Sequence, residues 1–560
     1  MRSPASNETT PLRVVPRPTR VTTGETVLRL SGDFSIDIDN SSSLKSSIPR
    51  DLEQAIHHTT ATLHKNRHRY LSPQRGAEFL ISGTQHTEIQ KLILSLNGNG
   101  KPRSIAHDAV LPVEDRVAAE RYELELATDG SAHIEADTSL GLYRGLTTFQ
   151  QLFFYSGGKD GFQYTPHAPI NIEDQPAFGW RAVLLDTSRN WFGEEALLKM
   201  LDTMALIKMN VFHWHITDSN SWPLGLDDFP ELAGKGAYSP EEVYQQKQIQ
   251  KIVLYANARG IDVVPEIDMP GHTAIIAESH PELIAGYQRT PFVKYAHQPP
   301  AGQLRFADDK VTEWTKGLLQ SAVTVFSSPY FGTGGDELNT TCMMEDEETA
   351  TTLKSKGWTL EKALDNFTEQ THAVVRANKK TPLVWQEMVL THGDLPSVKK
   401  DTLVSIWIDS KDAAKVLAKG FRIVHAAADY FYLDQGQGGW LGEEGGGDSW
   451  QGPYKSWQKM YSFDPYKDVE EGKRKLVMGG QCSLWAEQTD ETNLETVLWP
   501  RAAAVAELFW TGAGAEGYPR SSVEAFPRMH DVRFRMVDRG VRAIPLQPYW
   551  SALRPGTTNK

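Results

Sequence analysis

From Trp180 onward, short apolar runs alternate with longer amphipathic segments, and this alternation limits the folds open to the chain. Each run has the length of a buried strand, and most are followed by a segment with apolar residues at helical spacing. Eight runs fit this description: residues 182–185, 211–214, 261–264, 330–333, 382–385, 403–407, 422–425 and 476–478. The clearest helices are expected over residues 194–209, 241–259, 360–378, 411–419 and 495–510.

Eight strands, most followed by a helix, predict an α/β fold of the (β/α)8 barrel type with long loops. An open, doubly wound parallel sheet would produce the same alternation. Such a sheet usually carries a glycine-rich phosphate loop after its first strand, and none follows residues 182–185 here. The barrel is therefore the preferred interpretation.

The first 179 residues contain no tryptophan, whereas all 15 tryptophans of the chain lie at or after Trp180. Strands are expected over residues 26–30, 79–82 and 121–127, and helices over residues 51–66 and 140–154. We expect a smaller α+β domain over residues 1–176 that supports the barrel of residues 177–560.

The composition excludes several classes of protein. Hydrophobic residues at 40% and charged residues at 23% are typical of a globular chain, and no run approaches the roughly 20 apolar residues of a membrane span. The net charge of −13 argues against nucleic acid as a partner, because phosphate binding needs concentrated Lys and Arg. Two cysteines, Cys342 and Cys482, cannot provide a disulfide framework.

The sequence leaves the compartment open. Residues 1–20 lack the apolar core of a secretory signal, which favours a protein that stays inside the cell or one whose signal has been removed. Four triplets that begin at Asn7, Asn40, Asn339 and Asn366 fit the N-glycosylation pattern, although such triplets often arise by chance.

A barrel enzyme carries its reactive side chains at the C-terminal ends of its strands. Each candidate strand here leads into aromatic or ionisable residues, which a purely structural barrel would not need. In chain order these residues include Arg189, Asp218, His272, Asp336, Glu337, Trp385, Trp407, Tyr432, Asp434, Trp485 and Glu487.

The adjacent acids Asp336 and Glu337 are the strongest candidates for catalysis. Adjacent acids usually lie in a solvated loop, but Gly334 and Gly335 would let the backbone approach its neighbours closely. We expect partial desolvation there to raise the pKa of a carboxyl group toward the range of a general acid.

The histidine pair His213 and His215 shares one face of a strand, a spacing that also suits a metal. Beyond Asp268 and His272, the later strand ends offer no further cluster of ligands, so we expect no metal and no cofactor. Aromatic residues that recur at strand ends beside carboxylates favour a carbohydrate, because aromatic rings stack on the apolar faces of sugars.

The chain resembles family 20 of the glycoside hydrolases, the β-N-acetylhexosaminidases, and most closely the fungal ones. The resemblance is carried by motifs that occur in the right order from the first domain almost to Glu487. They are GLYRG at 141–145, LDTSR at 185–189, HWHITD at 213–218, PEIDMPGH at 265–272 and GGDE at 334–337.

The resemblance implies an exo-acting, retaining enzyme that removes terminal N-acetylhexosamine residues, from β-linked GlcNAc or GalNAc, through an oxazolinium intermediate. Glu337 would be the general acid and base, Asp336 would hold the acetamide N–H, and Tyr432 would donate to the acetamide oxygen. Asp218 and His272 would tune Glu337. The remaining residues would bind sugar: Trp385, Trp407 and Trp485 as walls, and Arg189, Asp434 and Glu487 at the hydroxyls.

The sequence departs from the secreted fungal pattern where many relatives have cysteines, because Gln435 and Gln451 stand at the corresponding positions. The resemblance implies secretion and often a homodimer, for which we expect the exposed aromatics of the segment from Trp510 to form the interface. Two other readings remain, a catalytically silent sugar-binding barrel and a metal-dependent hydrolase.

Overall fold

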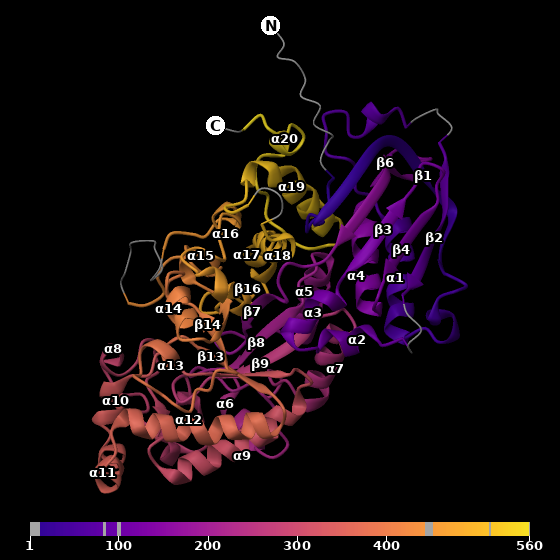
Figure 1. The fold of residues 1–560 in the computed structure, drawn as a ribbon. Helices are drawn as coiled ribbons and strands as arrows, with labels where there is room; N and C mark the ends of the chain where they lie inside the picture. Colours follow the sequence, from indigo (N-terminus) through magenta and orange to yellow (C-terminus); the bar gives the residue numbers. More distant parts are fainter. Residues whose placement is uncertain (1–11, 82–85, 98–101, 443–451, 514–516, 559–560) are drawn as a thin grey trace.

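The chain folds into a six-stranded sheet with helices, followed by a closed barrel of eight parallel strands (Figure 1). The computed structural model describes residues 12–81, 86–97, 102–442, 452–513 and 517–558. The prediction of a (β/α)8 barrel preceded by a smaller domain is confirmed. The sheet ends at Asp174 and the barrel begins at Trp180, and the proposed boundary at residue 176 lies between them.

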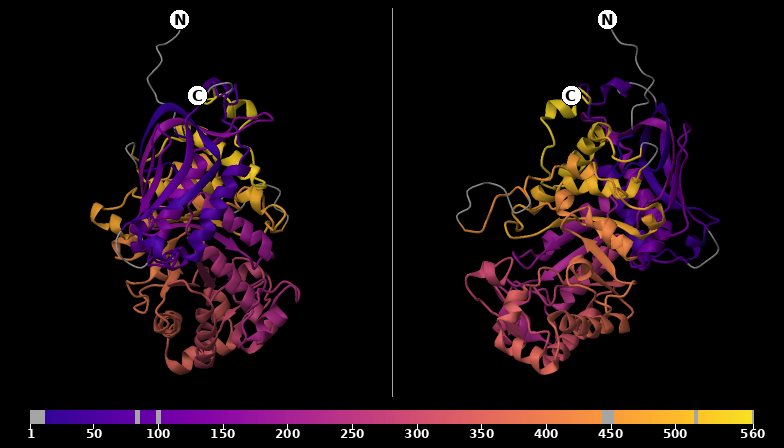
Figure 2. Two further views of the ribbon diagram at one scale, coloured as in Figure 1. Left: turned by 90° about the vertical axis from the view of Figure 1, so that its right-hand side faces the viewer. Right: turned by 60° about the vertical axis from the view of Figure 1, so that its left-hand side comes forward.

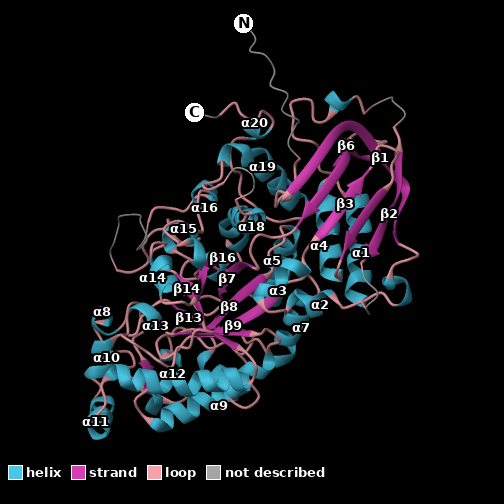
Figure 3. Ribbon diagram, viewed as in Figure 1, coloured by secondary structure: helices cyan, strands magenta, loops and turns pink. Residues whose placement is uncertain are grey.

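The front sheet has the strand order β1-β2-β4-β3-β6-β5, and the long first strand also pairs with β6. The first half of β1 runs antiparallel to β6, and its second half runs parallel to β2. Helices α1 and α4 pack beside this sheet, which Figure 3 draws in magenta. The elements are β1 (Arg20–Ile38), α1 (Arg50–Lys65), β2 (Glu88–Leu96), α2 (Ile105–Ala109), α3 (Val113–Ala119), β3 (Tyr122–Leu126), β4 (Ala132–Ala136), α4 (Ser139–Gln151), β5 (Phe154–Tyr155) and β6 (Gln163–Asp174).

The barrel strands follow one another around the ring in chain order, and the last strand closes on the first. All eight predicted strands are present, with the bounds β7 (Trp180–Asp186), β8 (Val211–Thr217), β9 (Asp262–Ile267), β12 (Tyr330–Gly334), β13 (Thr381–Trp385), β14 (Leu403–Ile406), β15 (Arg422–His425) and β16 (Val477–Leu484). The main helices around them are α5 (Glu194–Leu206), α7 (Gln246–Asn257), α9 (Asp309–Val325), α12 (Leu360–Ala377), α14 (Asp412–Ala418) and α18 (Arg501–Thr511).

Further elements lie in the loops of the barrel and in the C-terminal part of the chain. They are α6 (Pro230–Gly236), β10 (Ile284–Ala285), α8 (Phe292–Tyr295), β11 (Gln303–Leu304), α10 (Thr340–Met344), α11 (Glu347–Lys356), α13 (Glu387–Leu390), α15 (Ala428–Phe431), α16 (Trp457–Tyr461), α17 (Leu494–Leu498), α19 (Ser522–Asp538) and α20 (Tyr549–Ala552). The two views of Figure 2 show the C-terminal helices at the same end of the molecule as the front sheet.

Charged and aromatic side chains join the front sheet to the barrel. Trp510, on α18, packs in the hydrophobic core of the front sheet, and its indole N–H donates to Oδ1 of Asp174 at 2.9 Å. The other carboxyl oxygen of Asp174 lies 3.0 Å from Nζ of Lys208 and accepts from the hydroxyl of Tyr122 at 2.6 Å. All four side chains are buried, so this contact between the two domains is closed to solvent.

Three local predictions are wrong. The strand expected over residues 79–82 is absent, because residues Ala77–Phe79 form a 3-10 helix and Ser82 lies outside the described residues. The helix expected from residue 241 begins at Gln246, where Gln245 and Gln248 form a capping box. The helix expected over residues 495–510 is divided at Trp499 and Pro500, since proline lacks the N–H that a helix interior needs.

The two cysteines, Cys342 and Cys482, are buried and free, so no disulfide joins them. Among the described residues, no helix combines the length and the apolar composition that crossing a membrane requires.

Candidate active site

A cavity of about 260 Å³ opens at the C-terminal end of the barrel strands. Nine of the eleven predicted site residues line it: Arg189, His272, Asp336, Glu337, Trp407, Tyr432, Asp434, Trp485 and Glu487. The other two, Asp218 and Trp385, contact residues that line the cavity. The strand-end argument therefore brought together residues that are up to about 300 positions apart in the sequence.

Asp336 and Glu337 follow β12 through two glycines in the left-handed region, Gly334 at φ 61° and Gly335 at φ 95°. A Cβ on Gly334 would lie 1.8 Å from Oδ1 of Asp268, and the N–H of Gly335 donates to the same oxygen at 2.8 Å. Only glycine permits this close approach. Glu337 itself has a φ of 51°, a costly conformation that is typical of functional sites.

His272 connects the acidic pair to a buried carboxylate. Its Nδ1 lies 3.1 Å from Oδ2 of Asp218, and its Nε2 lies 3.6 Å from Oδ2 of Asp336 and 3.4 Å from Oε2 of Glu337. Nη1 of Arg189 lies 2.9 Å from the same oxygen of Asp218. His272, like Glu337, adopts a left-handed backbone, with φ at 52°.

These contacts determine where protons are held. Burial opposes the charge on His272, but Asp218 and Asp336 raise its pKa well above the ordinary histidine value. Burial opposes ionisation of Asp218, but Arg189 and His272 hold its pKa well below the usual aspartate range. His272 is therefore a cation and Asp218 an anion at neutral pH.

The two acids of the pair have opposite pKa shifts. Burial raises the pKa of Asp336, against the effect of the His272 cation. Burial also opposes ionisation of Glu337, but the hydrogen bond and charge of His272 lower its pKa below the ordinary value. Our expectation that desolvation raises the pKa of the acid is thus wrong for Glu337, because a cation faces it.

Aromatic rings form the walls of the cavity. Trp407 stacks on Tyr432 with centroids 6.2 Å apart, and the ring of Trp485, tilted by 54°, also lies 6.2 Å from Tyr432. The indole N–H of Trp407 donates to the carboxylate of Glu387 at 2.8 Å. Trp385 is buried behind Trp485, at a centroid distance of 6.1 Å, and is not among the residues that line the cavity.

Polar groups also line the cavity. Nε2 of Gln298 donates to Oε1 of Glu487 at 3.0 Å, and Arg189 donates to Oε1 of Gln298 at 3.4 Å. Burial and repulsion from the carboxylate of Glu487 raise the pKa of Asp434 well above its usual range. Burial also raises the pKa of Glu487. One buried oxygen of Asp434 has no protein partner, so this group is arranged to bind a polar ligand.

Sequence reasoning missed several residues of the cavity: His297, Gln298, Trp440, Leu441 and Gln488. They lie on loops, where neither strand nor helix periodicity applies. Trp440 is 41% exposed at the rim and follows Gly438 and Gly439, and this exposed aromatic after two glycines is the one signal that could have found it.

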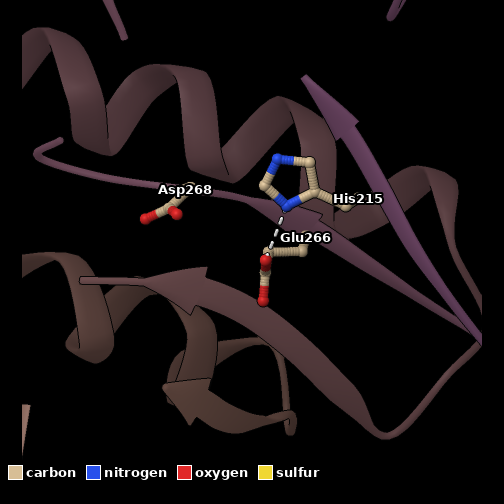
Figure 4. A group of neighbouring side chains, drawn as sticks. All are labelled: His215, Glu266 and Asp268. Atoms are coloured by element: carbon tan, nitrogen blue, oxygen red, sulfur yellow. Dashed lines mark hydrogen bonds and ion pairs between the residues drawn. The ribbon is translucent and has the colours of Figure 1, made fainter. Parts of the chain in front are cut away.

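Within the described part of the chain, two groups of side chains have a spacing that a metal could use: His215, Glu266 and Asp268, and the overlapping group of Asp268, His272 and Asp336. Figure 4 shows the ring of His215 directed at Glu266, with Asp268 to one side. Nδ1 of His215 lies 2.8 Å from Glu266 and Nε2 lies 3.0 Å from Asp218. Because both ring nitrogens already bond carboxylates, the residues fit a hydrogen-bonded network better than a metal site.

Known protein families match most of the chain. The family described as "Glycosyl hydrolase family 20, catalytic domain" matches residues 178–513, and the one described as "beta-acetyl hexosaminidase like" matches residues 14–152. A beta-hexosaminidase of Arthroderma benhamiae is 35% identical over 452 residues, which cover 78% of this chain and 73% of the relative. A chitooligosaccharidolytic beta-N-acetylglucosaminidase of Ostrinia furnacalis is 33% identical, with coverage of 77% and 73%.

Solved structures share the fold. An exo beta-N-acetylglucosaminidase of Vibrio harveyi, in complex with N-acetylglucosamine, has a TM-score of 0.74 at 22% identity and covers 97% of this chain and 80% of its own. A beta-N-acetylhexosaminidase of Streptomyces coelicolor has a TM-score of 0.71 at 22% identity, with coverage of 97% and 100%.

Proposed function

Because the chain belongs to glycosyl hydrolase family 20, we propose that it is an exo-acting β-N-acetylhexosaminidase. Its substrates are oligosaccharides and glycoconjugates that end in a β-linked N-acetylhexosamine, chitooligosaccharides among them. One observation carries the proposal, the joint placement of Asp336 and Glu337 at the cavity with the ring of His272 between them and Asp218. The arrangement places one carboxyl group for the leaving oxygen and a second one for the substrate amide.

In the first step, Glu337 donates its proton to the glycosidic oxygen, and the bond between that oxygen and C1 breaks. The carbonyl oxygen of the substrate's 2-acetamido group forms a bond to C1 from the opposite face, which gives an oxazolinium ion. Asp336 accepts a hydrogen bond from the acetamide N–H and stabilises the positive charge, while Tyr432 donates to the acetamide oxygen.

In the second step, the Glu337 carboxylate takes a proton from water, whose oxygen bonds to C1. The bond between C1 and the acetamide oxygen breaks, and the hemiacetal leaves with net retention of configuration. The protein need not supply a nucleophile, because the substrate carries it. His272, which faces Glu337 and is held by Asp218, adjusts the acidity of Glu337 through both steps.

The remaining residues fix the sugar ring. Trp407 and Trp485 pack on its faces, and Trp385 supports them from behind. Arg189, Asp434 and Glu487 bind the ring hydroxyls, and desolvated polar groups of this kind reject ligands that lack the matching hydroxyl. The aromatic walls contribute mainly by holding the acetamide close to C1, because an amide is a weak nucleophile until it is held there.

A comparison of two chromogenic substrates tests the proposal. The chain should cleave an aryl N-acetyl-β-glucosaminide and leave the plain β-glucoside almost untouched, because only the first carries the acetamide. A chelator should not change the rate. Equal turnover of the two glycosides would exclude substrate assistance, loss of activity with chelator would favour a metal-dependent hydrolase, and binding without turnover would favour a silent sugar-binding protein.

Assembly and compartment belong to the proposal as well. The dimer expected from the segment after Trp510 cannot use Trp510 itself, which is fully buried, whereas Tyr549 and Trp550 are 48% and 55% exposed.

Secretion with glycosylation is proposed from the family. Asn40 is exposed and suits it, whereas the side chain of Asn339 caps α10. Gel filtration and deglycosylation of the protein from its own host test these two points.

A further inference from the structure

A chain of buried hydrogen bonds runs from the active site into the interior of the barrel. Behind His272 stands Asp218, then His215 at 3.0 Å, Glu266 at 2.8 Å and His213 at 3.0 Å. Acid and histidine alternate along it, and each of these carboxylates bonds the histidines on both sides. The sugar-binding cavity reaches only the first member of this chain.

Glu266 is the fourth member of this chain and is held by three donors on two strands. His213 and His215, both on β8, bond its two oxygens, and the indole N–H of Trp385 on β13 lies 3.3 Å from Oε1. A Cβ at Gly332 on β12 would lie 2.7 Å from Cβ of Glu266, so only a glycine on the neighbouring strand leaves room for this side chain. The carboxylate is 1% exposed and cannot touch a sugar.

The charges on the chain depend on Glu266. Burial opposes the charge on His215, but the hydrogen bonds with Asp218 and Glu266 raise its pKa to about 9. Burial also opposes ionisation of Glu266, but His213 and His215 lower its pKa to about 2. Asp218 is consequently surrounded by three cations at close to 3 Å, which are Arg189, His215 and His272.

We propose that Glu266 is a positioning residue for the hydrolysis, acting through His215 and Asp218 on the ring of His272 and so on the proton of Glu337. The inference rests on the proposed function and extends it by one residue that the cavity does not contain. A purely structural role would leave Glu266 as one of several buried acids that hold strands together.

Replacement of Glu266 removes two opposite charges, and the one nearer to the active site decides the direction in which the pKa of His272 and Glu337 moves. In Glu266→Gln the amide can donate to Nδ1 of His215, so His215 stays neutral and still donates to Asp218. The variant therefore loses the positive charge of His215, which touches Asp218. It also loses the negative charge of Glu266, which lies one residue farther from the active site. The potential at His272 becomes more negative, and both His272 and Glu337 hold their protons to higher pH.

Other charged groups around these histidines stay in place. Asp268, just after the end of β9, has a carboxyl oxygen within 4.8 Å of a ring nitrogen of His215 and of His272. Arg189, from the loop after β7, bonds Asp218, and Asp336 and Glu337 face His272 from the loop after β12. Since none of them is altered in Glu266→Gln, a change in the pH profile reports the loss of the Glu266 charge.

The matched control is Asp262→Asn. Asp262 begins the same strand, is fully buried and pairs with Arg116 at 2.6 Å, but it lies at the opposite end of the barrel. Both variants should lower the melting temperature. Only Glu266→Gln should reduce kcat/KM, by about tenfold, and move both limbs of its pH profile upward by roughly half a unit. Unmoved limbs in Glu266→Gln, or equal shifts in both variants, would overturn the inference.

A second readout does not need turnover. In enzyme labelled with 15N histidine, the ring signals of His272 are assigned by their absence in His272→Gln, and they report its charge against pH. The midpoint should rise in Glu266→Gln and stay in place in Asp262→Asn. If the midpoint is the same in all chains, the role of Glu266 is refuted, even if the unmodified chain cleaves N-acetylglucosaminides. If the midpoint is raised in Glu266→Gln but the unmodified chain cleaves none of these substrates, only the proposed function is refuted.

Discussion

Nε2 of His272 lies 3.4 Å from Oε2 of Glu337, so the charge of the ring acts directly on the carboxyl group and the two groups titrate together. The ring cannot turn away, because its other nitrogen bonds Asp218 at 3.1 Å. A general acid with a lowered pKa is a poor proton donor alone, but its neighbour carries the proton it needs. Coupled groups of this kind titrate as a pair rather than as separate residues.

This coupling predicts the alkaline limb of the pH profile. The pair loses its proton only when pH rises through the raised pKa of His272, so kcat/KM should stay high beyond the ordinary histidine value of about 6.5. In His272→Gln the proton must be held by Glu337 alone, and the limb should move to lower pH. Measurement of kcat/KM against pH for both chains checks this, and an unmoved limb would contradict it.

Glu337→Gln should remove the proton donor while leaving the shape of the cavity unchanged. We expect kcat on chitobiose to fall by about 10²–10⁴-fold, the range of general acid catalysis, with little change in the affinity for N-acetylglucosamine. An aryl glycoside with a good leaving group should lose less, because its departure needs less protonation. If the variant cleaved chitobiose at more than a tenth of the original rate, Glu337 would not be the acid.

Gly334→Ala should lower activity through the position of the acidic pair. The new Cβ would overlap the carboxyl group of Asp268 and push the segment that carries Asp336 and Glu337. Gly357→Ala is the control, because Gly357 has a similar φ of 63° and open space around it. Gly357→Ala should lose about 1 kcal/mol of stability from the left-handed backbone alone. Gly334→Ala should lose more because of the overlap, and only Gly334→Ala should lose kcat. Parallel urea melts and kinetics would separate the two effects.

Asp174→Asn should destabilise the interface between the domains, because it leaves the buried ammonium of Lys208 without its carboxylate. Removal of one member of a buried ion pair costs about 3–5 kcal/mol. The neighbouring Glu173 pairs with Arg20 on the surface, so Glu173→Gln should cost less than about 1 kcal/mol. Chemical denaturation measures both, and equal losses would show that the buried pair contributes no more than the exposed one.

The barrel and most of its site could be predicted because each depends on local pattern. Buried parallel strands are nearly continuous apolar runs, and the residue after each run must lie at the same edge of the ring. Arg189 and Glu487 could be assigned to one site in this way although 298 positions separate them. The break at Pro500 could also have been predicted, since a proline in a helix interior removes a backbone hydrogen bond and kinks or breaks the helix.

Other features depend on tertiary contacts that no local pattern contains. The pKa of Glu337 is lowered because His272 faces it, and the approach of these two residues requires the closed barrel. Gln298 reaches Arg189 and Glu487 from a loop without periodicity. The long first strand, Arg20–Ile38, was only partly predicted because it bends and pairs with two partners in turn.

Trp510 belongs to a helix of the barrel but completes the core of the front sheet, where its N–H is bonded to Asp174. The barrel therefore cannot be joined to an unrelated front domain unless that domain brings both a hollow for an indole and a carboxylate at its edge. Mutations on either side of this contact would be accepted only in pairs. The two domains are in this sense inherited together, and recombination between distant homologues should succeed only when both are exchanged.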